Sequence, residues 1–124
     1  MGTKTVLIAD DEPSLRLLVS ATISSDEYEV VEAADGDEAW AAVQQHHPVL
    51  ALLDVQMPGR TGLDLARAIK GDPELRDIRV ILLTSKALEA DVKEGLAAGA
   101  DLYLTKPFSP LELLGVVEQT MGVA

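Results

Sequence analysis

The sequence has no cysteine, an aromatic content of only 3%, and about half as many basic as acidic residues. Without cysteine, neither a disulfide framework nor a thiolate metal site can form. The 21 acidic and 10 basic residues give a formal net charge of −11, which would repel a nucleic-acid backbone or an anionic membrane surface. We therefore expect no direct binding of nucleic acid by this chain alone.

Long hydrophobic runs are also missing. Acidic residues, glycine or proline interrupt every apolar segment before it could span a bilayer. The first five residues lead straight into an apolar segment and lack the apolar region and cleavage site of a signal peptide. We expect a cytoplasmic protein with no membrane partner, and a reducing cytosol also suits a chain without cysteine.

The hydrophobic content of the chain is 48%, enough to build one core at a length of 124 residues. No linker, low-complexity segment or internal repeat interrupts the sequence. The composition therefore predicts a single domain over residues 1–124.

Short apolar segments rich in strand-forming residues alternate with segments whose apolar residues recur at helical spacing. Predicted strands cover 5–9, 28–33, 49–53, 80–83 and 102–105. Predicted helices cover 13–23, 37–46, 62–70, 88–98 and 110–121. Two helix ends carry signals of their own: Gly99 suits a left-handed C-terminal cap, and Ser109 with Glu112 matches a capping box.

This alternation predicts a parallel sheet covered by helices on both faces, with right-handed crossovers. Five strands in such a doubly wound, flavodoxin-like α/β fold favour the order 2-1-3-4-5. Ligands of this fold bind beyond the carboxyl ends of the strands, where the order reverses between the first and third strands. That rim is the place to look for chemistry.

Five polar residues follow strands that end at this rim: Asp10 and Asp11, Asp54, Thr84, and Lys106. Three converging carboxylates repel one another, so we expect raised proton affinities there. A hard divalent cation would relieve the repulsion, and magnesium prefers such oxygen ligands and pairs readily with phosphate. The sequence therefore predicts a magnesium site.

Carboxylates act as nucleophiles in aspartyl-phosphate chemistry, and Asp54 is the candidate nucleophile once magnesium neutralises Asp10 and Asp11. Phosphoryl transfer then depends on positioning and on positive charge around the phosphoryl oxygens. Lys106 can supply the charge and Thr84 a hydroxyl. We expect a phosphoacceptor that at most catalyses its own phosphotransfer and dephosphorylation, rather than an enzyme in the usual sense.

Four sequence motifs, in this order, carry a resemblance to a known family: Asp10-Asp11-Glu12-Pro13, the segment from Leu53-Asp54 through Pro58-Gly59 to Gly62, Leu83-Thr84-Ser85, and Leu104-Thr105-Lys106-Pro107-Phe108. Over essentially its whole length the chain resembles the receiver domains of two-component response regulators, typified by the chemotaxis response regulator. Each motif alone is weak evidence, whereas the ordered set is specific.

The resemblance implies that Asp54 is phosphorylated by a phosphohistidine on a sensor histidine kinase or phosphotransfer protein, and that a downstream effector reads the change. It implies that the backbone carbonyl of Gln56 completes the metal site. It also implies that Thr84 moves toward the phosphoryl group while Tyr103 swings inward. Lys106-Pro107 resembles the family's cis peptide bond.

One residue departs from the commonest family pattern, and two others leave the lifetime of the aspartyl phosphate open. Thr61 stands where an acidic or amide residue often precedes the glycine, which affects the cap of the third helix but no ligand. Gln56 and Lys86 lie at positions that tune hydrolysis of the aspartyl phosphate in this family, so its lifetime is left open by the sequence, as are the kinase and the output partner.

Three other functions would also suit parts of this sequence. A flavin- or nucleotide-binding protein shares the topology, but Asp10 and Asp11 would place negative charge against a cofactor phosphate. A magnesium-dependent phosphatase needs a substrate pocket for which the short chain has no spare domain. A pseudo-receiver would not need the complete set of acids, Thr84 and Lys106. His46-His47 is interpreted as an exposed helix end and Trp40 as core packing.

Overall fold

A computed structural model describes residues 3–85 and 89–122 of the chain. Its sheet has five parallel strands in the order β2-β1-β3-β4-β5, which confirms the predicted flavodoxin-like fold. The strands are β1 (Lys4–Ala9), β2 (Tyr28–Ala33), β3 (Leu50–Asp54), β4 (Arg79–Ser85) and β5 (Leu102–Lys106).

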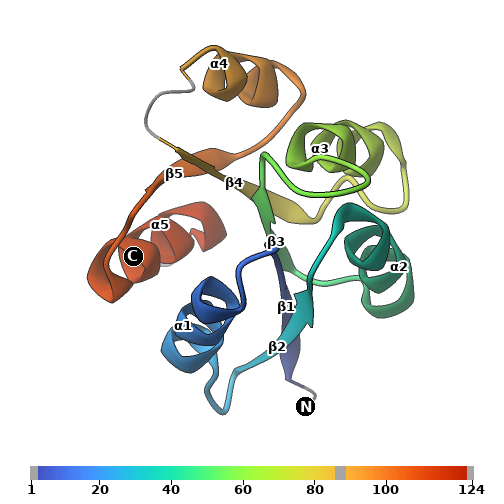
Figure 1. Ribbon diagram of the computed structural model, residues 1–124. Coiled ribbons are helices and arrows are strands. Elements are labelled where there is room, and N and C mark those ends of the chain that lie inside the picture. Colours follow the sequence, from blue (N-terminus) through green and yellow to red (C-terminus); the bar gives the residue numbers. More distant parts are fainter. Residues whose placement is uncertain (1–2, 86–88, 123–124) are drawn as a thin grey trace.

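Five helices cover the sheet (Figure 1). They are α1 (Pro13–Ile23), α2 (Gly36–His46), α3 (Gly62–Gly71), α4 (Glu89–Ala97) and α5 (Pro110–Met121). Helices α1 and α5 lie on one face and α2 and α3 on the other, while α4 contacts α3 and β4. None of the helices in the described part of the chain is long and apolar enough to cross a membrane.

Side chains of one strand alternate between two separate hydrophobic cores, because successive strand residues point to opposite faces. In β1, Val6 and Ile8 pack in the core beneath α1 and α5, whereas Leu7 and Ala9 pack in the core beneath α2 and α3. Both cores need apolar residues from the same strand, which explains why the central strands β1, β3 and β4 contain continuous apolar runs rather than alternating ones.

The predicted boundaries agree with the structure to within one or two residues, with informative differences. Strand β4 is longer than predicted at both ends, and Asp54 and Lys106 are the last residues of β3 and β5 rather than the residues after them. The helix predicted from residue 88 is observed from Glu89, and Leu88 lies outside the described residues.

Capping explains where two helices begin. At α3 the Thr61 hydroxyl accepts from the Asp64 amide and the Asp64 carboxylate accepts from the Thr61 amide, both at 3.1 Å. The predicted capping box of Ser109 and Glu112 at α5 is confirmed at 3.1 and 3.0 Å. Gly99 has a φ of +105°, as its predicted left-handed cap requires.

The loop after β3 is held against the start of α2. The Gly36 amide donates to the Pro58 carbonyl at 2.9 Å, and a Cβ added at Gly36 would lie 1.9 Å from the Arg60 carbonyl oxygen. The Arg60 guanidinium sits 5.1 Å from the ring centre of Trp40, which is half-buried against the core. These contacts with α2 hold in place the loop that begins just after Asp54.

A second tie joins the connections that lead into β4 and β5, at the end of the sheet away from the acids. The Lys70 ammonium group donates to the carbonyls of Arg76 and Ile78 at 3.1 and 2.7 Å and pairs with the Asp101 carboxylate at 3.1 Å. Asp101 in turn accepts from the Val80 amide at 2.8 Å. The starts of β4 and β5 are thus locked together.

Candidate metal and phosphoacceptor site

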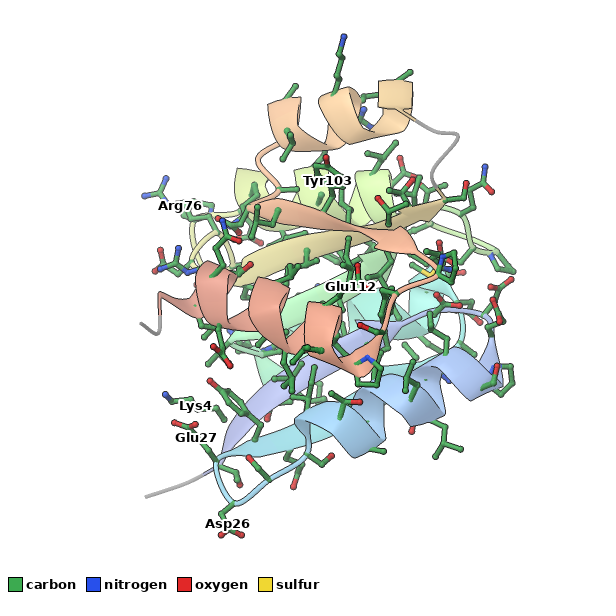
Figure 2. The ribbon with its side chains drawn as sticks, turned by 90° about the vertical axis from the view of Figure 1, so that its left-hand side faces the viewer. Lys4, Asp26, Glu27, Arg76, Tyr103 and Glu112 are labelled. Atoms are coloured by element: carbon green, nitrogen blue, oxygen red, sulfur yellow. The ribbon has the colours of Figure 1, made fainter. Side chains whose placement is uncertain are left out.

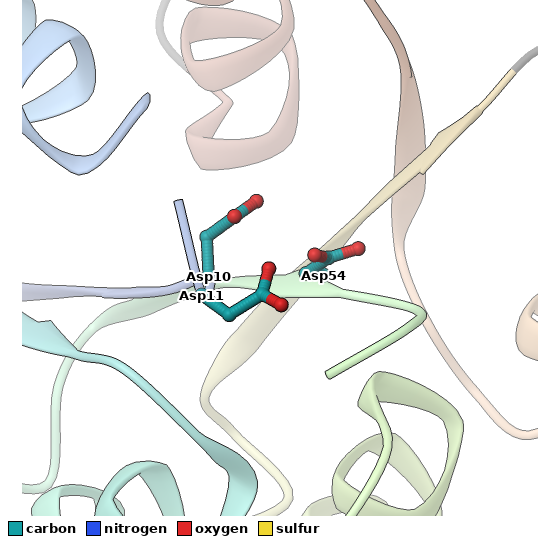
Figure 3. Close-up of side chains that lie close together, drawn as sticks. All are labelled: Asp10, Asp11 and Asp54. Atoms are coloured by element: carbon teal, nitrogen blue, oxygen red, sulfur yellow. The ribbon is translucent and has the colours of Figure 1, made fainter. Parts of the chain in front are cut away.

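Three acidic side chains meet at the carboxyl ends of β1 and β3, the two neighbouring strands at which the order reverses (Figure 3). One carboxylate oxygen from each of Asp10, Asp11 and Asp54 lies within 4.8 Å of the others. Asp10 and Asp54 are buried, whereas Asp11 is exposed. This all-oxygen donor set is the kind that a hard divalent cation such as magnesium prefers, so these residues fit the predicted ion.

The pKa of Asp54 is raised from 3.8 to about 6, mainly by burial and secondly by the neighbouring Asp10 charge. Two contacts oppose the rise: the Gln56 amide donates to Asp54 Oδ1 at 3.1 Å, and the Lys106 ammonium lies 3.1 Å from Oδ2. The expected electrostatic strain is therefore present at Asp54, whose ionised form is destabilised by its surroundings.

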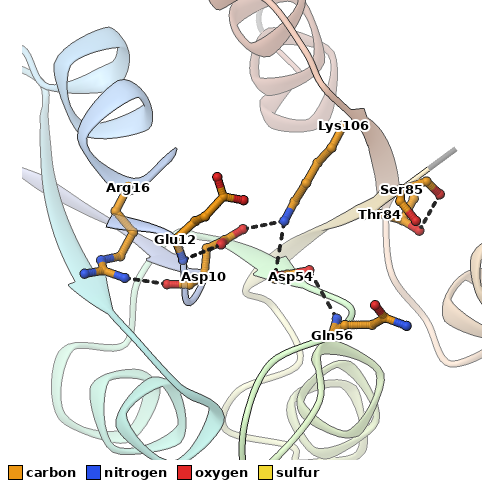
Figure 4. A network of polar contacts seen from close by, with 8 residues as sticks. All are labelled: Asp10, Glu12, Arg16, Asp54, Gln56, Thr84, Ser85 and Lys106. Atoms are coloured by element: carbon orange, nitrogen blue, oxygen red, sulfur yellow. Dashed lines mark hydrogen bonds and ion pairs between the residues drawn. The ribbon is translucent and has the colours of Figure 1, made fainter. Parts of the chain in front are cut away.

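Lys106 is the counterion of the buried acids (Figure 4). Its Nζ atom lies 2.7 Å from Asp10 Oδ2 and 3.1 Å from Asp54 Oδ2. Desolvation lowers the pKa of Lys106, but its contacts with Asp10 and Asp54 outweigh that effect and the net pKa is raised. The following peptide bond, Lys106-Pro107, is cis, as the resemblance implied.

An open cavity of about 460 Å³ lies over the acids. Its lining consists of Asp11, Asp54, Gln56, Met57, Pro58, Ser85 and Lys106. The volume is many times the roughly 30 Å³ that one water occupies in the liquid, so it has room for an ion with its water ligands and a small anion. The lining carries both the carboxylates of Asp11 and Asp54 and the Lys106 ammonium group.

The two predicted switch residues lie away from the acids in this structure. Thr84 is buried and its hydroxyl donates to the Ser85 carbonyl at 3.2 Å rather than to an acid. Tyr103 is 42% exposed on β5, the edge strand next to α4 (Figure 2). Lys86, predicted to influence the lifetime of a phosphoaspartate, lies outside the described residues.

One residue at the site was missed by the sequence analysis. Arg16 donates through Nη1 to the carbonyl oxygen of Asp10 at 2.7 Å, and its side chain is only 16% exposed. A signal was present in the sequence, since Arg16, Val19 and Ile23 share one face of the first helix by their spacing. An arginine on the buried face of a helix that follows two acids calls for a partner close by.

The fold and the acidic rim define a class of protein, and the family comparison agrees: the model for the response regulator receiver domain matches residues 6–118. The chain belongs to this family. Membership excludes the flavin-binding and phosphatase alternatives as descriptions of the chain.

Individual relatives give the same assignment. The chain is 43% identical over 114 residues to the phosphate regulon transcriptional regulatory protein PhoB of Pseudomonas aeruginosa, an alignment that covers 92% of this chain and 50% of that protein. The chain thus spans about half the length of the curated relatives it matches.

Solved structures match over the whole fold. The chemotaxis response regulator CheY4 of Vibrio cholerae superposes with a TM-score of 0.88 at 34% identity, covering 96% of this chain and 99% of that one. The receiver domain of sensor histidine kinase PA1611 from Pseudomonas aeruginosa PAO1 has a TM-score of 0.85 at 29% identity, covering 98% and 99%. That structure has a magnesium ion coordinated in its active-site cleft.

Proposed function

We propose that this receiver domain is a phosphorylation-dependent signalling switch in which Asp54 accepts a phosphoryl group beside a magnesium ion. Asp10, Asp11, Asp54 and the backbone carbonyl of Gln56 hold the ion. The observation that carries this proposal is the convergence of three carboxylates, within 4.8 Å, next to a lysine that contacts two of them. The magnesium ion in the PA1611 receiver structure supports the choice of metal.

The donor is a phosphohistidine on a sensor histidine kinase or a phosphotransfer protein. An Asp54 carboxylate oxygen attacks phosphorus, a new P–O bond forms, the P–N bond breaks, and the electron pair leaves on the imidazole, which takes up a proton. When bound, magnesium would screen the charge of the phosphoryl oxygens, and Lys106, which lines the same cavity, provides a second positive charge. No cofactor other than magnesium is needed.

Phosphorylation then shifts the equilibrium between two conformations of the domain. The Thr84 hydroxyl exchanges its Ser85 partner for a phosphoryl oxygen, and Tyr103 moves inward from its exposed position on β5. Such a modification shifts an equilibrium only by interacting differently with the two states. The surface formed by α4, β5 and α5 is therefore the one that a downstream effector protein or domain reads.

The location and contacts of the switch are proposed from the composition and charge of the chain. We place the chain in the cytoplasm, as one receiver domain over residues 1–124, without direct contact to nucleic acid or membrane. The absence of cysteine and the net charge of −11 support this setting. The effector is either a separate protein or a domain joined to the receiver.

The test is to incubate the purified chain with a small acyl phosphate and magnesium, and to count added phosphoryl groups by mass spectrometry. We expect one group on the wild type, none on Asp54→Asn, and none when a chelator removes magnesium. Equal labelling of Asp54→Asn, or no labelling of the wild type, would overturn the proposal. Lys106→Ala should retain the fold and lose the switching response.

A further inference from the structure

Arg16 lies behind the acidic rim. It joins three parts of the fold: α1, the segment just after β1, and β2. Its Nη1 donates to the Asp10 carbonyl oxygen at 2.7 Å (Figure 4), and its Nε donates to Glu32 Oε1 on β2 at 3.1 Å. The Arg16 side chain is 16% exposed, whereas the next residue, Leu17, is 68% exposed. Arginine with two fixed partners in a mostly buried place is a built contact rather than a solvated surface charge.

The carbonyl that Arg16 holds belongs to the peptide group joining Asp10 to Asp11. Because a peptide group is planar, fixing its oxygen fixes the direction in which both flanking residues leave it. The other polar groups of Asp10 are held as well: its amide donates to the Ala33 carbonyl at 3.1 Å, and its Oδ1 accepts from the Glu12 amide at 2.9 Å. The arginine is thus the contact that orients the shared peptide.

Glu32 also balances the positive charge of Arg16 behind the acids. Its carboxylate pairs with Arg16, so most of the guanidinium charge is balanced locally. An unbalanced cation behind Asp10 would oppose the approach of a divalent ion. The Arg16–Glu32 ion pair therefore orients the peptide behind the acidic rim and adds little net positive potential there.

We propose that Arg16 is a positioning residue for the metal site: by holding the peptide between Asp10 and Asp11, with Glu32 as its anchor, it keeps both carboxylates aimed at a shared ion. This inference rests on the proposed magnesium site. Partners that orient metal ligands from behind typically change metal affinity by 10-fold or more when they are lost.

The sign of the effect separates positioning from simple electrostatics. Removing a cation near acids should strengthen magnesium binding if only charge matters. If Arg16 positions the acids, Arg16→Met should weaken magnesium binding roughly 10-fold, as measured by isothermal titration calorimetry. Arg67→Met is the matched control, because Arg67 forms a similar 3.0 Å ion pair with Glu94 between α3 and α4, away from the acids.

A second measurement needs no metal. Hydrogen exchange of the Glu12 amide, which bonds to Asp10 Oδ1, should become at least severalfold faster in metal-free Arg16→Met and stay unchanged in Arg67→Met. If wild type binds no magnesium, the proposed function fails, and this exchange rate still decides the role of Arg16.

Arg16→Lys covers the case in which Arg16→Met does not fold, since it keeps the charge and removes the planar fork. We expect it to share both effects in weaker form. The proposal is overturned if a folded Arg16 variant binds magnesium as tightly as wild type or more tightly, or if its Glu12 amide remains as protected as in wild type.

Discussion

The Lys106 ammonium lies 3.1 Å from an Asp54 carboxylate oxygen, so the candidate phosphoacceptor already has a positive partner belonging to the chain itself. The same ammonium reaches the other buried acid, Asp10, at 2.7 Å. Two carboxylates that would otherwise repel are therefore bridged by one cation. Much of the behaviour of the site depends on this bridge.

Replacing Lys106 by methionine should destabilise the protein by about 3 kcal/mol at pH 7, because breaking a buried ion pair leaves carboxylates uncompensated. Urea denaturation measures this loss. The deficit should shrink at pH 5, where Asp54, with its pKa of about 6, takes up a proton. Lys4→Met is the control: its 3.8 Å pair with Glu27 is exposed and should matter little. Equal losses in the two variants would contradict a special role for Lys106.

The pKa of Asp54 predicts a pH-dependent contribution to stability. Folding raises this pKa from 3.8 to about 6, so the folded state binds the proton more tightly than the unfolded state. The contribution of Asp54 is therefore most favourable below pH 4 and is lost as the pH rises to about 6. Relative to Asp54→Asn, the metal-free wild type should lose roughly 1–3 kcal/mol across this range.

The measurement is a series of denaturant titrations of both proteins from pH 4 to pH 7.5 in a chelating buffer. Parallel stability profiles would show that Asp54 ionises as freely in the folded protein as in the unfolded chain. Added magnesium should narrow the difference at pH 7.5, since an ion bound only by the folded state stabilises it.

Gly36 should not tolerate a side chain. A Cβ there would lie 1.9 Å from the Arg60 carbonyl oxygen, so Gly36→Ala should cost about 2 kcal/mol as overpacking does. Gly115→Ala is the matched control, because nothing lies within 4 Å of its Cβ position on α5, and it should stabilise by about 0.5–1 kcal/mol. Thermal melts of the two variants should move in opposite directions.

The same substitution should be visible in Trp40 fluorescence, because Arg60 lies over the ring and would be displaced with the loop. An unchanged emission spectrum in Gly36→Ala, together with an unchanged melting temperature, would contradict the predicted clash with the Arg60 carbonyl.

Thr61 provides a test of helix capping. Its hydroxyl accepts from the Asp64 amide at 3.1 Å, so Thr61→Ala should cost about 1 kcal/mol. Thr61→Asp should retain the stability, because aspartate caps at least as well as threonine. Chemical denaturation distinguishes the two. A loss in both would indicate that the hydroxyl has a role other than capping.

The sequence predicted the fold well because its signals are local. Continuous apolar strands and helical spacing depend on neighbouring residues, and the capping box of Ser109 and Glu112 is likewise a local pattern. The ends of β3 and β5 were harder to predict. Asp54 pairs in register with Leu83, and Lys106 with Ser85, so polar residues continue strands whose apolar runs have already ended.

The candidate site also has one part that the sequence predicts and another part that it does not. Topology was enough to bring Asp10, Asp11 and Asp54 together, because parallel strands end at one rim. The contact of Arg16 with Glu32 could not be read from local pattern, since it joins residues 16 positions apart on a helix and a neighbouring strand. The bond from Gly36 to Pro58 joins residues that are even farther apart in sequence, and nothing in composition or periodicity specifies it.

The tie around Lys70 has a mechanical consequence. Since it locks the starts of β4 and β5 to each other and to the end of α3, these strands cannot slide lengthwise as a pair without breaking three contacts of one ammonium group. Thr84 and Lys106 lie at the opposite ends of the same two strands. The Lys70 contacts therefore oppose sliding of β4 and β5 without contacting the residues of the acidic rim.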